Sequence, residues 1–219
     1  MKMNLDQMEV RILGSLIEKE LTTPENYPLS LNTLTSACNQ KSNRDPAMSL
    51  SEDDVVRGLD RLGGRGLARL TATGGRVARY RHSLADQLGL TPPSLAVLGE
   101  LMLRGPQTVG ELRSRAERMV PLPDLLTVEA ILAELQGHAP PLVTRLPRQP
   151  GRKEQRYAQL FAGEPQLPAD VPATHPEPAR LRVMEEDERI AKLDGEVAAL
   201  RMEITALRRM LDELKVLFE

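Results

Sequence analysis

The sequence predicts a mainly α-helical protein with small β-hairpins, in which two tandem winged-helix domains precede a C-terminal coiled-coil helix. Three observations carry this prediction. Apolar residues recur at helical spacing through most of the chain, short alternating segments follow them in two places, and a long heptad pattern closes the sequence. Aromatic residues make up only 2% of the 219 residues, so the core must be built from aliphatic side chains, which favours helices over β-sandwiches.

The first unit, residues 1–84, contains three predicted helices followed by a hairpin. Apolar residues spaced by three and four indicate a helix from about Asp6 to Glu20, and Ser30 can cap a second, short helix. A third helix is expected from about Glu52 to Arg65, between an N-cap signal and a glycine cluster. Two alternating segments then flank a Thr-Gly-Gly turn. Helix, helix and hairpin in this order are typical of a winged helix-turn-helix.

Arginines gather in the third helix and the hairpin. Between Arg57 and His82 the chain has seven arginines and one acid, Asp60, which gives a formal balance of plus six. Such a patch suits a polyanion, with the helix in the major groove of DNA and the hairpin on phosphate. The nucleic-acid contacts predicted in this region are Arg57, Arg61, Arg65, Arg76, Arg79 and Arg81.

A polar loop, residues 39–48, separates the second and third helices and is longer than the connection of an ordinary helix-turn-helix. It offers Lys41 and Arg44, together with amide side chains, as hydrogen-bond donors. One interpretation is a contact surface for phosphate or for a partner protein. The other is that Asn, Ser and Asp side chains tie the loop to its own backbone.

The loop and the segment before it match two long motifs of a known family. The first motif is Cys38-Asn39-Gln40-Lys41-Ser42-Asn43-Arg44-Asp45-Pro46, and the second is Thr23-Pro24-Glu25-Asn26-Tyr27-Pro28-Leu29-Ser30-Leu31-Asn32. From about Asp6 to Phe161 the chain resembles the YceH-like family of uncharacterised bacterial proteins. The resemblance implies a tandem winged-helix fold and no established activity.

The second unit, residues 85–162, repeats the order of the first. Two prolines mark the boundary, three helical patterns follow, and two alternating segments flank a further turn. Because Arg79-Tyr80 is echoed by Arg156-Tyr157, the two units look like diverged copies. The second hairpin is basic too. Its predicted nucleic-acid contacts are Arg148, Arg152 and Lys153.

A Pro-rich linker, residues 163–180, leads to a predicted coiled-coil helix, residues 181–219. The heptads place β-branched residues at a and leucine at d, the preference of a parallel dimer, and the charges at e and g attract in that arrangement. The predicted dimerisation residues are Ile190, Leu193, Val197, Leu200, Ile204, Leu207, Leu211 and Leu214. The alternative is an amphipathic helix that folds back on its own domains.

Composition narrows the classes of function. The formal net charge is −2, which argues weakly against a general DNA binder. No apolar run approaches the length of a membrane span and no signal peptide is evident, so a cytoplasmic protein without a membrane partner is expected. The single cysteine, Cys38, falls on an apolar helix face and is predicted to pack in the core.

No catalytic constellation is found, and we expect neither an enzyme nor a cofactor or metal. The three histidines fall in a hairpin, a loop and a linker without a second ligand at metal spacing. The preferred function is a DNA-binding protein such as a transcriptional regulator, which contacts duplex DNA through the third helix and wing of the first domain and forms a homodimer. The acids Glu52, Asp53 and Asp54 at the start of the third helix would repel phosphate and argue against DNA binding. The alternative is a non-enzymatic protein-interaction adaptor, favoured by the near-neutral net charge and the acidic C-terminal region. A ligand pocket between the units would leave no trace in the sequence.

Overall fold

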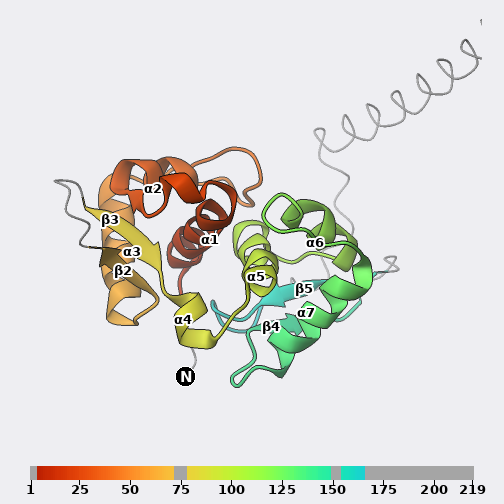
Figure 1. Ribbon diagram of the computed structural model, residues 1–219. Coiled ribbons are helices and arrows are strands. Elements are labelled where there is room, and N and C mark those ends of the chain that lie inside the picture. The colour runs from red at the N-terminus through yellow and green to blue at the C-terminus, as the bar shows by residue number, and fades with distance from the viewer. Residues whose placement is uncertain (1–3, 72–77, 149–153, 166–219) are drawn as a thin grey trace, which may run out of the picture. The chain divides into compact units, whose positions relative to one another are not determined.

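The chain divides into two compact parts, and the first of them comprises residues 1–166 (Figure 1). This part contains two halves with a similar order of elements, which correspond to the two predicted winged-helix domains. The computed structural model describes residues 4–71, 78–148 and 154–165. All eight predicted dimerisation residues lie outside these ranges, so the coiled coil stays a prediction. Arg76, Arg152 and Lys153 lie outside them as well.

The first half contains three helices, a 3-10 turn and a small antiparallel sheet. Its elements are α1 (Gln7–Thr22), η1 (Pro24–Asn26), β1 (Leu29–Ser30), α2 (Leu31–Cys38), α3 (Glu52–Gly64), β2 (Ala68–Thr71) and β3 (Arg79–His82). The strand order is β1-β3-β2, with Tyr80 of β3 opposite both Leu29 and Leu70. Capping boxes begin both α1 and α3, and the one that begins α3 confirms the predicted N-cap signal. The predicted helices and hairpin are confirmed, whereas β1 was not foreseen because a two-residue strand has no alternating pattern.

The second half has helices α5 (Pro92–Arg104), α6 (Val109–Ala116) and α7 (Leu125–Gly137), and strands β4 (Val143–Arg145) and β5 (Tyr157–Gln159). The short helix α4 (Leu84–Leu88) connects the two halves. Strands β4 and β5 form a hairpin, and a bridge between Gln107 and Tyr157 stands where β1 pairs with β3 in the first half.

Matching contacts support the predicted internal repeat. Nη1 of Arg79 donates to the Pro28 carbonyl at 2.8 Å, and Nη1 of Arg156 donates to the Pro106 carbonyl at 2.9 Å. The N-cap of the next helix lies two residues after each of these prolines, where a Ser or Thr side chain accepts from the backbone N–H three residues on. The two halves therefore place equivalent residues at equivalent positions around α2 and α6.

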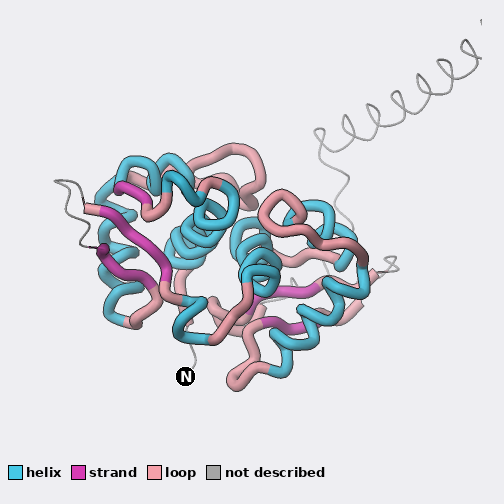
Figure 2. The backbone as a smooth tube through the Cα atoms, in the orientation of Figure 1, coloured by secondary structure: helices cyan, strands magenta, loops and turns pink. Residues whose placement is uncertain are grey.

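Helices α1 and α5 lie side by side at the centre of the unit and join the two halves (Figures 1 and 2). A Cβ atom added at Gly14 would lie 3.0 Å from the Cβ atom of Met102, and one added at Gly99 would lie 3.0 Å from Cγ2 of Ile17. The buried apolar residues of both halves form a single cluster. The two halves thus share one hydrophobic core.

Cys38 lies in this core, as predicted, with an exposed fraction of 0%. Burial raises the pKa of its thiol to about 11, which makes the thiolate a minor species at neutral pH. Within the described part of the chain, no helix is long and apolar enough to cross a membrane.

Candidate functional site

The arginines of α3 lie at the surface, but each one described contacts a carboxylate. Nη2 of Arg57 lies 2.5 Å from Oδ1 of Asp54 in the preceding turn. Arg61 donates to two acids at the start of α1, with Nη2 2.7 Å from Asp6 and Nε 3.2 Å from Glu9. Such exposed pairs add little to stability, but they cancel charge.

The same holds for the next two arginines along the chain. Nη1 of Arg65 lies 3.8 Å from Glu9, and Nη2 of Arg69 lies 3.1 Å from Asp86 of α4. Asp53 and Asp60 add exposed negative charge on α3 itself. The expectation of an unpaired cationic face is therefore not met, because acids from α1, α3 and α4 meet these guanidinium groups.

The remaining predicted nucleic-acid residues are scattered. Arg79 is exposed and, among the described residues, forms no ion pair. Arg81 is half-buried, and its Nε is buried without a hydrogen-bond partner in the described structure. Lys41 and Arg148 are exposed at separate places, in the polar loop and after β4. Arg79 and Arg81 share β3, where Arg81 is opposite Arg69 of β2, whereas Lys41 and Arg148 lie in other segments.

Arg44 is a correction to the sequence analysis, because its guanidinium is buried and cannot reach a phosphate. Its Nη2 lies 2.5 Å from Oε2 of Glu18, and the same nitrogen donates to the Ala37 carbonyl at 2.9 Å. Asn43, the residue before it, donates to Glu100 of α5 at 2.9 Å. The polar loop is therefore held to α1 through Arg44 and to α5 through Asn43.

This loop completes a buried ion network between the halves. Glu18 of α1 and Glu100 of α5 are both buried, and Nη2 of Arg118 lies 2.6 Å from the first and 2.7 Å from the second. Burial acts to raise the pKa of Glu18, but the Arg44 and Arg118 guanidinium groups hold it below its ordinary value. No local pattern predicted this network, since Glu18 and Arg118 are 100 residues apart.

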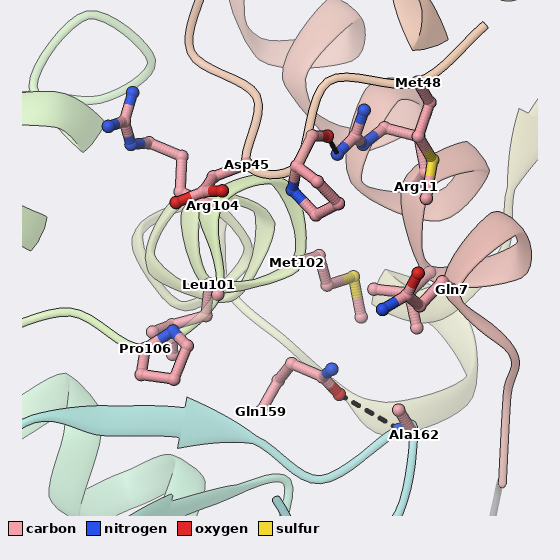
Figure 3. A pocket seen from close by; sticks show the side chains of 13 residues that line it. Gln7, Arg11, Asp45, Met48, Leu101, Met102, Arg104, Pro106, Gln159 and Ala162 are labelled. Carbon is pink, nitrogen blue, oxygen red and sulfur yellow. Dashed lines mark hydrogen bonds between the residues drawn. The ribbon is translucent and has the colours of Figure 1, made fainter. Parts of the chain in front are cut away.

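A cavity of about 330 Å³ lies beside the network, where the polar loop meets α1 and α5 (Figure 3). Asp45, Pro46 and Met48 line it from the loop, and Leu101 and Met102 line it from α5. Most of this surface is apolar. The described residues that line the cavity include no serine, threonine, cysteine, lysine or histidine.

Arg11 also lines this cavity and is buried. Its Nη2 donates to the Pro46 carbonyl at 2.6 Å and its Nη1 to the Cys38 carbonyl at 3.2 Å. Burial, with the neighbouring charge of Arg44, lowers the pKa of Arg11. Because both terminal nitrogens hold backbone carbonyls of the loop and of α2, we assign Arg11 to fixing the loop.

Helix α7 presents a different kind of surface, which the sequence analysis did not single out. It has no lysine or arginine, and Leu125 and Leu126 at its start are 49% and 73% exposed. Glu129 and Glu134 are exposed one and two turns further on. The sequence does contain a signal for this surface, because α7 has more apolar residues than one buried helix face can hold.

The described residues form a mainly helical protein of two halves with small antiparallel sheets. A family model described as "Protein of unknown function, DUF480" matches residues 5–152. A UPF0502 protein of Geotalea uraniireducens (strain Rf4) is 75% identical over 219 residues, and the match covers 100% of each chain. A UPF0502 protein of Geobacter sulfurreducens is 59% identical over the same 219 residues and 100% of each chain. The chain therefore belongs to this uncharacterised bacterial family, which confirms the resemblance although these descriptions do not carry the name YceH.

Proposed function

We propose that this protein is a cytoplasmic, non-enzymatic protein-interaction module built from two winged-helix halves. The order helix, strand, helix, helix, strand, strand and the β1-β3-β2 sheet support a winged helix in the first half. In the second half, the bridge between Gln107 and Tyr157 replaces the pairing of β1 with β3, which supports a winged helix there as well. Winged helices bind DNA in some proteins and other proteins elsewhere, so the fold does not identify the partner. The charge and polarity of the exposed surface must distinguish the two functions.

The observation that carries the proposal is the charge of the two helices that would enter a DNA groove. In α3 the acids nearby neutralise every described arginine, and in α7 there are no basic residues at all. Affinity for duplex DNA comes largely from unpaired cations that displace counterions from phosphate. Neither helix supplies them. The surface thus supports the adaptor reading over the DNA-binding regulator that the sequence alone favoured.

The partner chemistry follows from the start of α7. Leu125 and Leu126 expose apolar area that a partner would bury, and Glu129, one turn further on, adds exposed negative charge beside it. Apolar centres with a charged rim are typical of protein interfaces, and complementary charge sets which partner docks. We commit to a partner protein whose contacting face is apolar and basic. We also propose that the heptad segment, Ile190 to Leu214, joins two copies in parallel and presents two such faces.

Replacing Leu126 by glutamate is expected to weaken partner binding at least tenfold, because a charge would enter the apolar centre of the contact. The partner is captured with the full-length protein from nuclease-treated bacterial lysate, identified, purified and titrated against the variants. Leu70→Glu is the matched control, since Leu70 is 60% exposed on β2, away from α7. Equal affinity of the L126E and L70E variants, or a partner captured only from a parallel lysate without nuclease, would contradict the proposal.

A further inference from the structure

A second cavity, of about 370 Å³, lies in the first half between the end of α1, the start of α2 and β3. Two cations line it, Lys19 from α1 and Arg79 from β3. The rest of its polar lining consists of hydroxyl and amide side chains, from Thr23, Asn26, Ser30, Thr33, Ser36 and Gln40. Among the described residues that line this cavity there is no acid. The site therefore combines two positive charges with neutral hydrogen-bonding groups.

In the second half, the position that corresponds to this cavity is occupied by a side chain of the protein itself. Arg156 is the equivalent of Arg79, because each precedes the tyrosine of the last strand and donates to a proline carbonyl. The N-caps that follow those prolines are Ser30 and Thr108. Three residues after each N-cap, the first half has threonine and the second half has glutamate, Glu111.

Glu111 neutralises the second half's arginine from within the chain. Its Oε1 lies 3.4 Å from Nη2 of Arg156 and 3.7 Å from Nη2 of Arg115, and its Oε2 accepts from the Thr108 N–H at 2.9 Å. Thr33 cannot do the same, since its hydroxyl is neutral and bonds to the hydroxyl of Ser30. The first half thus retains the arginine of this arrangement and lacks the carboxylate.

The acids near the first-half cavity do not replace that carboxylate. Nζ of Lys19 lies 3.8 Å from Oε2 of Glu18, but this carboxylate is already held by Arg44 and Arg118. Glu25 in η1 accepts from the amide of Asn26 and lies on the exposed surface. Nearby charge therefore leaves the cavity positive.

We propose that the first-half cavity binds an oxyanion of a small ligand, a carboxylate or a phosphate group, at the position that the Glu111 carboxylate occupies in the second half. Arg79 and Lys19 would balance its charge. The Ser36 hydroxyl and one hydroxyl of the bonded Ser30–Thr33 pair would donate to its oxygens. This inference does not depend on the protein-interaction function, because it concerns a different face of the molecule.

The test uses the isotope-labelled full-length protein, with the Arg79 side-chain N–H and the Thr33 backbone N–H as NMR probes. Inorganic phosphate and N-acetylglutamate amide are titrated separately, with sodium chloride holding the ionic strength constant. Saturable shifts of both signals are expected with at least one of the two. A response to phosphate alone identifies a phosphate site, a response to the capped glutamate alone identifies a carboxylate site, and no response beyond that to chloride overturns the proposal.

Two exchanges between the halves make the test specific. Thr33→Glu should weaken binding at least tenfold, because the new carboxylate would fill the site as Glu111 does. Asn32→Glu is the control, since it adds the same charge to the same helix turn at a residue that does not line the cavity. Glu111→Thr should add a second saturable response at the Arg156 side chain. Equal binding by the T33E and N32E variants would overturn the assignment of this cavity.

Discussion

Replacing Glu18 by leucine is expected to lower the free energy of unfolding by about 3–5 kcal/mol, the usual cost of breaking a buried ion pair from one side. The side chain of Arg44 is 0% exposed and would lose the carboxylate that it contacts at 2.5 Å. Arg118 would keep Glu100 but lose its second partner. Urea unfolding of the full-length protein at neutral pH measures the change. The control is Glu25→Leu at an exposed position, which should change the free energy by less than about 0.5 kcal/mol.

The ion pair of Glu18 with Arg44 also predicts how the free energy of unfolding changes with pH. Because the pKa of Glu18 is lower in the folded protein, its contribution is present above the unfolded-state pKa, about 4.3, and is lost as the pH falls through the folded-state value. The gap in stability between the wild type and the E18L variant should therefore narrow below about pH 4. A gap that is already absent at pH 7 would mean that Arg44 finds a different counter-ion.

Replacing Ile17 by alanine is expected to cost about 2–5 kcal/mol, because a fully buried side chain at the contact of α1 with Gly99 of α5 would leave a cavity. Since both halves share this core, unfolding of residues 1–166 should remain a single transition that shifts as a whole. Circular dichroism and tyrosine fluorescence in urea check both points. Leu126→Ala, at a 73% exposed side chain, is the control. Two separated transitions, or a loss below about 1 kcal/mol, would contradict the shared core.

Local patterns predicted most of the fold because helices and hairpins are specified by neighbours in the sequence. The spacing of apolar residues located α1 and α3, and their N-caps Asp6 and Ser51 are at the predicted starts. The repeat of Arg79-Tyr80 in Arg156-Tyr157 was also visible, and both arginines hold a proline carbonyl. These features need no knowledge of distant contacts.

The predicted cationic surface was less reliable, because the sequence analysis counted charges along the chain without the acids that the fold brings next to them. Seven arginines against one acid suggested a cationic face, but the acids that meet Arg61 are 52 and 55 residues away in α1. Arg44 was placed at the surface because its loop is polar, whereas Glu18 draws it into the interior. Pairing across the fold decides whether a charge is free, and a linear count cannot show it.

Retardation of random duplex DNA over a range of salt concentrations tests the central claim, that α3 and α7 carry no free cationic surface. We expect no shift of the DNA at micromolar protein in low salt, and no difference between the wild type and an Arg57→Ala, Arg61→Ala double variant. Binding that falls steeply between about 50 and 200 mM salt, and that weakens further in the double variant, would contradict the claim and return the protein to the DNA-binding class.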